Sequence, residues 1–273
     1  MALRPSRDYS TVAKIDGPHV SYLVAACRKT AFEPYRWTFP FAGSFPYLGY
    51  FKYADAAAHA RRLEKKGWDV HVAGAAAYNT PLWFSDPIPE PALQDSVGEL
   101  AVLLIHELSH GTIHYRSKMD FNEALASFIG ETGAAQFLEG RYGTQSLELA
   151  EFHSFRERDR LWVGIMADLR HELDAVYRSS VPDAVKLQKR EAIFLKGRER
   201  LNEITPLGKE FVLNNAVLMT YGLYHRDFSP FQAVHDSCLR QWPCTIKKFR
   251  KLNRRNPEGS LKAAALKSGN RRP

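Results

Sequence analysis

The segment from Leu104 to Ser127 contains side chains that can bind a metal, in a spacing typical of a helix. It reads LIHELSHGTIHYRSKMDFNEALAS. His106 and His110 are four residues apart, so on a helix both imidazoles lie on one face, about 6 Å apart along the axis. This spacing allows both imidazoles to bind one zinc ion, with Glu107 placed as general base. Because the HExxH pattern fixes few positions, the alternative is a pair of ordinary core histidines.

A zinc site with two histidines needs a third protein ligand, and three side chains compete for this role. His114 is eight residues after His106, about 12 Å along the helix axis, which is too far for a shared metal ion. Glu123 and Glu131 follow on the next helix. If that helix folds back antiparallel, a residue near its start meets His110 most directly. This geometry favours Glu123 as the third ligand. Glu131 is the second choice, and its alternative role is that of a solvent-facing acid.

Two helices must position these residues. Ser96 and Glu99 form a capping box, which opens a helix that carries through His110. A polar loop follows, and Asp120 is a plausible N-cap for a second helix that is expected to stop at Gly140. The sequence therefore predicts an antiparallel helix pair around the histidines.

The rest of the chain predicts an α+β protein that is mainly α-helical. Residues 8–95 mix β-like runs, HVSYLVAA and DVHVAGAAAY, with one helix over 55–66, so we expect a small N-terminal mixed sheet there. Residues 145–203 have the spacing of one or two long helices interrupted at Pro182, and residues 206–225 and 229–251 predict two more. We expect a single domain over 1–252, with a substrate-side region at 8–95 and a helical catalytic region at 96–252.

Charge and cysteine content suggest the surroundings of the protein. Much of the net charge of +8 lies near the C-terminus, where residues 253–273 have the composition of a basic disordered tail. We expect this tail to be solvated and expect no nucleic acid partner; a tail that acts as a nucleic-acid-binding arm is the alternative. No transmembrane segment or signal peptide is visible, and three scattered cysteines are too few for a disulfide framework. The sequence as written therefore predicts a cytoplasmic protein.

Five blocks in fixed order resemble the bacterial putative aminopeptidase family, a gluzincin-like group of zinc metallopeptidases. The blocks are FPFAGSFPYLGYF, VAGAAAYNTPLWFSDP, LLIHELSH, FNEALASFIGETGA and NNAVLMTYGLYHRDFSPF. The similarity extends over roughly residues 9–252. It implies a zincin-like domain with His106, His110 and Glu123 as zinc ligands and Glu107 as general base. Family members usually begin with a lipoprotein-type signal, so a membrane-anchored periplasmic lipoprotein is the alternative location if upstream sequence is missing.

The remaining candidate residues concern the substrate. In zinc peptidases of this kind an extended strand pairs with the peptide substrate, and the small residues near Gly74 and Ala75 allow close approach. A tetrahedral oxyanion needs a further hydrogen-bond donor. The candidates for substrate binding are Gly74, Ala75, Tyr78 and Asn79, and those for the oxyanion are Tyr224 and His225. An ordinary edge strand and a core tyrosine are the alternatives for these two groups.

The predicted activity is zinc-dependent hydrolysis of peptides. The resemblance indicates an aminopeptidase, but the strand from Val70 to Asn79 has no carboxylate to hold a free ammonium, so an endopeptidase stays open. A non-catalytic zinc-binding or scaffold protein is the rival from another class. The oligomeric state and the preferred side chain are not encoded in any recognisable pattern.

Overall fold

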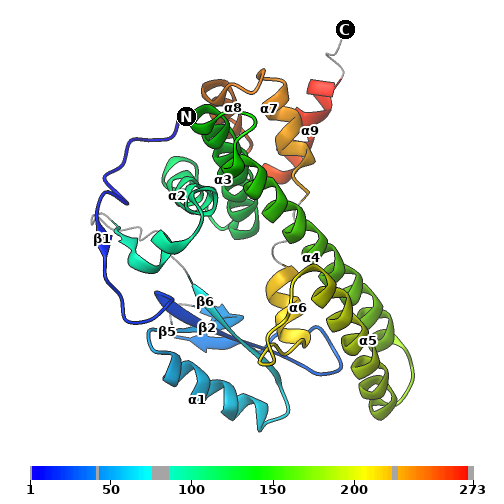
Figure 1. Ribbon diagram of the computed structural model, residues 1–273. Coiled ribbons are helices and arrows are strands. Elements are labelled where there is room, and N and C mark those ends of the chain that lie inside the picture. The colour runs from blue at the N-terminus through cyan, green and yellow to red at the C-terminus, as the bar shows by residue number, and fades with distance from the viewer. Residues whose placement is uncertain (1, 41–42, 76–85, 223–226, 270–273) are drawn as a thin grey trace. The chain divides into compact units, whose positions relative to one another are not determined.

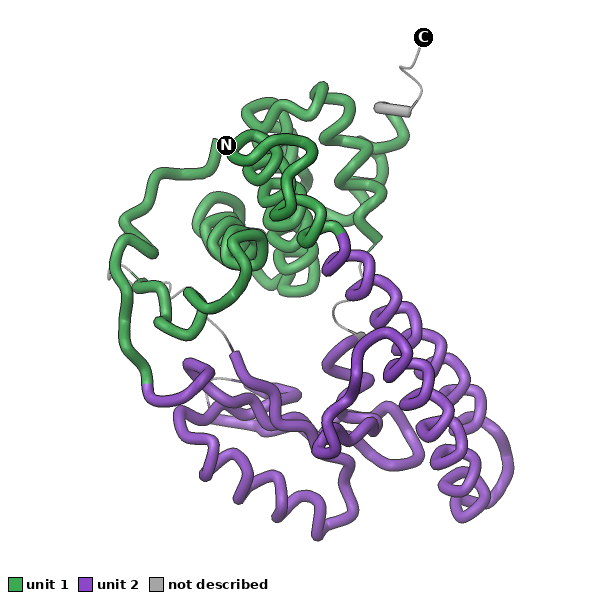
Figure 2. The backbone as a smooth tube through the Cα atoms, viewed as in Figure 1, with its two compact units in different colours: residues 1–15, 77–153, 226–273 green, residues 16–76, 154–225 purple. Residues whose placement is uncertain are grey.

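The computed structural model describes residues 2–40, 43–75, 86–222 and 227–269 (Figure 1). Helices contain 59% of the described residues and strands 12%, which confirms the mainly helical α+β class. The chain divides into two compact units (Figure 2), each assembled from separate segments of the sequence. Unit 1 is Met1–Ile15, Ala77–His153 and Arg226–Pro273; unit 2 is Asp16–Ala76 and Ser154–His225. None of the helices in these described ranges combines the length and apolar character that a bilayer crossing needs.

Unit 1 is built mainly from helices. Its only strands in the described residues, β1 and β7, pair in parallel, and the 3-10 helix η1 follows β7. Helix α4, Leu147–Arg178, starts here and continues into unit 2. The elements are β1 (Val12–Ala13), β7 (Ile88–Pro89), η1 (Glu90–Gln94), α2 (Val97–Thr112), α3 (Met119–Tyr142), α7 (Ser229–Asp236), α8 (Trp242–Arg250) and α9 (Pro257–Gly269).

The ends of α2 and α3 follow from local signals. The hydroxyl of Ser96 accepts a hydrogen bond from the amide of Glu99 at 3.2 Å, as expected for the N-cap of α2. Helix α3 differs from the prediction at both ends. It begins at Met119, so Asp120 lies in its first turn rather than at the cap, and it passes Gly140 and stops before Gly143. Of these two glycines, Gly143 has a positive φ, 97°, and Gly140 does not; a positive φ ends a helix readily.

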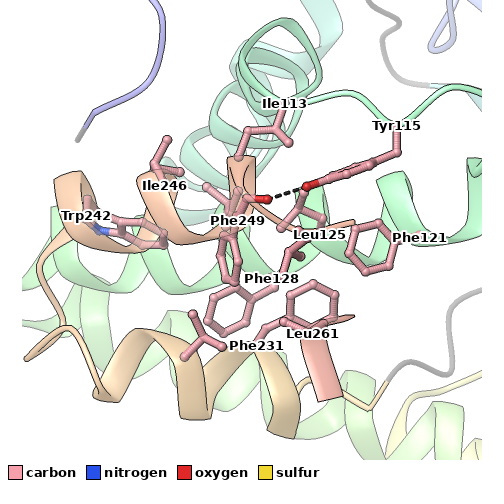
Figure 3. Close-up of a cluster of buried hydrophobic side chains, with 13 residues drawn as sticks. Ile113, Tyr115, Phe121, Leu125, Phe128, Phe231, Trp242, Ile246, Phe249 and Leu261 are labelled. Atoms are coloured by element: carbon pink, nitrogen blue, oxygen red, sulfur yellow. Dashed lines mark hydrogen bonds between the residues drawn. The ribbon is translucent and has the colours of Figure 1, made fainter. Parts of the chain in front are cut away.

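An aromatic cluster forms the core of unit 1 (Figure 3). Phe128 of α3 stacks on Phe231 of α7, with ring centroids 5.5 Å apart, and also packs edge-on against Phe249 of α8. The hydroxyl of Tyr115 donates to the carbonyl of Phe249, which links the α2–α3 loop to α8. The remaining members of the cluster are Ile113, Phe121, Leu125, Ile129, Val234, Trp242, Ile246, Leu252 and Leu261. The C-terminal helices therefore support the hairpin that carries His106 and His110.

The predicted disordered tail is a helix over most of its length. Helix α9 spans Pro257–Gly269, and Leu261 is 3% exposed inside the aromatic cluster. The side-chain oxygen of Asn256 accepts from the amide of Gly259 at 3.0 Å, which satisfies an end of the helix. The basic composition of residues 253–273 suggested disorder, but the buried leucine provides the apolar contact that stabilises the helix.

The cysteines also differ from the expectation. Cys238 and Cys244 form a disulfide, with their Cα atoms 5.6 Å apart, and Cys27 is the buried free thiol. The bridge spans a turn that divides the predicted helix over 229–251 into α7 and α8. Leu239 and Arg240 in this turn have φ values of 53° and 57°, a left-handed conformation in which a helix cannot continue. Two of the three cysteines therefore form one local disulfide.

Unit 2 is an antiparallel sheet with helices around it. The order β5–β2–β6 is antiparallel throughout, so the expected mixed sheet is wrong for these strands. Helix α1 covers one face through Ala56, Ala60 and Leu63, which pack with Val24 and Val70 (Figure 1). The elements are β2 (Ser21–Cys27), β3 (Trp37–Phe39), β4 (Gly43–Phe45), β5 (Tyr47–Tyr50), α1 (Tyr53–Glu64), β6 (Asp69–Ala75), α5 (Asp183–Ile204) and α6 (Asn215–Gly222).

A buried polar network joins the helices of unit 2 to β6. Asp69 accepts from the guanidinium of Arg190 on α5 and, at 3.0 Å, from the amide of Asn215 on α6. The side chain of Asn215 also accepts at 2.9 Å from the hydroxyl of Tyr177 on α4, whose pKa burial raises to about 12. Asn214 caps α6 and donates to the carbonyl of Val70. Both asparagines therefore have structural partners within unit 2.

Candidate metal centre

Three side chains of unit 1 bring their donor atoms together. The Nε2 atoms of His106 and His110 lie 3.2 Å apart, and the two carboxylate oxygens of Glu123 lie 3.4 Å and 3.3 Å from them. A metal ion can be held by three or more His, Cys, Asp or Glu side chains whose ligand atoms lie within 4.8 Å of one another. Among the residues that the structure describes, His106, His110 and Glu123 form such a group. The group contains Glu123, the favoured candidate, rather than Glu131.

The antiparallel packing of α2 and α3 creates this arrangement. His106 and His110 are one turn apart on α2, and α3 returns along it with Glu123 in its second turn. Further along α3, Gly130 lies directly against α2. A Cβ atom placed on Gly130 would be 3.1 Å from the carbonyl oxygen of Val102 and 3.3 Å from the Cβ of His106. The lack of a side chain at Gly130 therefore permits the close approach that joins the histidines to Glu123.

A buried asparagine fixes the loop between the two helices. The amide of Tyr115 donates to the side-chain oxygen of Asn122 at 2.8 Å, and the side-chain nitrogen of Asn122 donates to the carbonyl of Tyr115 at 2.8 Å. Asn122 is 4% exposed and directly precedes Glu123. This two-way bond holds the start of α3 in register with the end of α2. Sequence reasoning missed this role, although a polar residue directly after Phe121 in the pattern FNEAL was a usable signal.

The donor set fits zinc. Ligand atoms that are about 2.0 to 2.1 Å from a tetrahedral zinc ion lie about 3.3 Å from one another. The two Nε2 atoms are 3.2 Å apart, and each lies at a similar distance from a different carboxylate oxygen of Glu123. Imidazole nitrogen and carboxylate oxygen are also ligands that zinc accepts, and three protein ligands leave a fourth position for water or substrate. The side chains of His106, His110 and Glu123 are 20%, 19% and 39% exposed, so a small molecule has access to them.

Other predicted residues near the site have definite positions. Glu107 follows His106 on α2 and is half-buried. His114 is exposed and lies beyond the end of α2 at Thr112, so it is not on the helical face of the other histidines. Glu131 lies two turns beyond Glu123 on α3.

The predicted substrate residues belong in part to unit 2. Gly74 and Ala75 end β6, whose residues pair with β2 on one side, from Asp69 with Cys27 to Ala75 with Ser21. β6 is an outer strand of the described sheet. The ring of His19 fills the space beside Gly74, since a Cβ there would lie 2.1 Å from that ring. The small size of Gly74 therefore serves a contact within unit 2. Tyr78, Asn79, Tyr224 and His225 lie outside the described residues.

Comparison with known proteins gives one match. The model of the family described as "Putative aminopeptidase" matches residues 1–263. The match extends through α8 and into α9, beyond residue 252, where the resemblance was expected to end. Comparison with curated proteins and with solved structures gave no significant match. Because the family model covers nearly the whole sequence, the chain belongs to the putative aminopeptidase family.

Proposed function

We propose that this protein is a zinc-dependent aminopeptidase of the gluzincin type. The observation that carries the proposal is the approach of His106, His110 and Glu123 to within 3.2–3.4 Å of one another on the helix pair that contains the HExxH motif. Membership of a family named for aminopeptidases supports peptide hydrolysis. The zincin-like character of unit 1 rests on this hairpin.

The residues of the chain would divide the reaction between them. His106, His110 and Glu123 would hold zinc, which when bound polarises the scissile carbonyl and lowers the pKa of water. Glu107 then accepts the proton of the attacking water and delivers it to the leaving amine. A carbon–oxygen bond forms, the carbon–nitrogen bond of the peptide breaks, and Glu107 returns to its ionised form.

Two measurements, of metal content and of peptidase activity, each test a different part of this proposal. Glu123→Ala is expected to lose stoichiometric zinc, measured by elemental analysis of the purified protein, because it removes one of three ligands. Glu107→Gln should keep zinc and lower the turnover number by a factor of about 10² to 10⁴, the usual contribution of a general base. Glu139→Gln, an exposed change on the same helix as Glu123, is the control that should keep both properties.

Three outcomes would contradict the proposal. Full zinc retention in Glu123→Ala would point to a different ligand set. Unchanged turnover in Glu107→Gln would refute the proposed base. A wild-type protein that binds zinc and hydrolyses no peptide would favour the non-catalytic scaffold.

Exopeptidase and endopeptidase action differ in their need for a free ammonium group. The proposed aminopeptidase should release the first residue of an unblocked peptide and leave the same peptide untouched after acetylation of its N-terminus. Internal cleavage of both peptides, seen by mass spectrometry, would replace the aminopeptidase assignment with that of a zinc endopeptidase.

A further inference from the structure

The positive charge of the protein is concentrated in one part of the sequence. Residues 237–273 contain eleven Lys and Arg and one Glu, a formal charge of +10, whereas the whole chain has +8. The preceding 236 residues therefore have a net charge of −2. A separation of charge this strong calls for an explanation beyond solubility.

The structure places part of these charges on the folded helices α8 and α9 and part on the turns beside them. On α8 the apolar side chains of Trp242, Ile246 and Phe249 are buried in the core of unit 1, while Lys247 and Lys248 are exposed. On α9, Leu261 is buried, whereas Lys262 and Lys267 are exposed. We call the exposed cations of this region the C-terminal basic surface, which comprises Arg240, Lys247, Lys248, Arg250, Lys251, Arg254, Arg255, Lys262 and Lys267.

Few carboxylates neutralise this surface. Arg240 pairs with Asp236 at 3.1 Å, and Lys248 donates to the hydroxyl of Ser237 at 2.8 Å. Within the described residues no ion pair involves Lys247, Lys251 or Lys262. Their charges are therefore free to attract an anionic partner.

An exposed leucine directly precedes Arg240, one of these cations. Leu239 is 84% exposed in the turn that the Cys238–Cys244 disulfide closes, and it is next to Arg240. Both residues have the left-handed backbone conformation that L-residues avoid. The bridge and the buried Trp242 fix the base of this turn, so Leu239 projects into solvent. A second leucine, Leu266 on α9, is 75% exposed.

We propose that the C-terminal basic surface docks on a membrane that contains anionic phospholipids, with Leu239 entering the headgroup region. Basic side chains attract anionic lipids from within about a Debye length, and adjacent apolar side chains add contact with the acyl boundary. Single-stranded nucleic acid would favour exposed aromatic rings for stacking. Both aromatic residues of 237–269, Trp242 and Phe249, are buried. The inference rests on unit 1 alone and is independent of the proposed zinc chemistry.

Vesicle sedimentation of the full chain tests the proposal. The protein should sediment with vesicles of phosphatidylcholine and phosphatidylglycerol, and remain in solution with pure phosphatidylcholine vesicles. Each basic residue near the surface contributes about a fivefold change in partitioning, so the triple variant Lys247→Gln, Lys251→Gln, Lys262→Gln should bind roughly 100-fold more weakly. The matched control changes three exposed lysines of unit 2, Lys66, Lys189 and Lys196, to Gln and should bind as the wild type does.

A second variant tests the apolar contact without removing charge. Leu239→Asn keeps the left-handed turn, which asparagine adopts readily, and should weaken sedimentation with anionic vesicles about tenfold. Leu195→Gln, at an exposed leucine of α5, is the control and should have no effect. Circular dichroism should show that all variants are folded.

The proposal is overturned if both triple variants lose binding equally, since nonspecific net charge would then explain it. The proposal is also overturned if the protein does not sediment with anionic vesicles. Tighter binding to a random DNA duplex than to anionic vesicles, at the same salt concentration, would overturn it as well.

Discussion

Replacement of Gly130 by alanine would test the contact that brings the two helices of the candidate metal centre together. The new Cβ would be 3.1 Å from the carbonyl oxygen of Val102 and 3.3 Å from the Cβ of His106, so α3 must move from α2 by a few tenths of an ångström. Alanine favours the helix by about 1 kcal/mol relative to glycine, whereas overpacking costs about 1 to 3 kcal/mol. The free energy of unfolding should therefore fall by up to about 2 kcal/mol.

Gly140 on the same helix provides the matched control. A Cβ atom there has no neighbour within 4 Å, and the residue is exposed. Gly140→Ala should gain the helix propensity without the clash, a stabilisation of about 0.5 to 1 kcal/mol. Urea unfolding of both variants in the presence of a chelator compares the two effects, and the expected difference is about 1 to 3 kcal/mol.

Gly130→Ala should also weaken zinc binding. His106 and Glu123 lie on different helices, and a shift of a few tenths of an ångström exceeds the tolerance of about 0.2 Å for metal–ligand distances. We expect a loss of about tenfold or more in zinc affinity, measured by competition with a chromogenic chelator, and no loss for Gly140→Ala. Equal stability and equal zinc affinity of the two variants would refute the close approach of α2 and α3 at Gly130.

Three further predictions concern the scaffold. Burial lowers the pKa of His235 below its ordinary 6.5, so at a pH just below 6.5 the unfolded chain binds a proton at this histidine and the native chain does not. The free energy of unfolding should therefore fall as the pH drops below 6.5, and it should fall less steeply in His235→Asn. Reduction of the Cys238–Cys244 bridge, which closes a short loop, should lower the free energy of unfolding by about 2 kcal/mol. Asp69→Asn should destabilise unit 2 by about 3 to 5 kcal/mol because Arg190 stays buried without its partner.

A specific result would contradict each of these three predictions. Identical pH profiles of thermal unfolding for wild type and His235→Asn would show that this histidine does not couple folding to protons. Alkylation of Cys238 in the unreduced native protein would disprove the bridge, with Cys27→Ser as the control for the remaining thiol. For Asp69→Asn, a loss below about 1 kcal/mol in urea unfolding would mean that the buried pair is not intact.

The helix pair of the candidate metal centre could be predicted because its signals are local. The cap at Ser96 and the four-residue spacing of His106 and His110 depend only on helix geometry. The placement of Glu123 required one nonlocal assumption, a tight antiparallel return, which the structure bears out. The sequence did not show what makes this return tight, since the roles of Asn122 and Gly130 depend on contacts across the hairpin.

The sheet was less predictable than the helices. β2 and β6 were recognised as β-like runs, but the direction in which strands pair depends on connections that join distant parts of the chain. Gly74 shows the same limit. Its small size suggested space for a substrate, whereas the ring of His19 occupies that space, and no local pattern relates these two residues.

The C-terminal segment shows how composition can conceal a helix. Many cations with Gly, Pro and Asn predict disorder because such a segment has little apolar surface to bury. Pro257, Leu261 and Ala264, however, follow at intervals of four and three, a spacing that places them on one helical face, and the first two are buried. A basic segment with apolar residues at this spacing is better interpreted as a helix with a charged outer face. On a helix the charges hold fixed positions, so their effect on an anionic surface should depend on which lysines are removed and not only on how many.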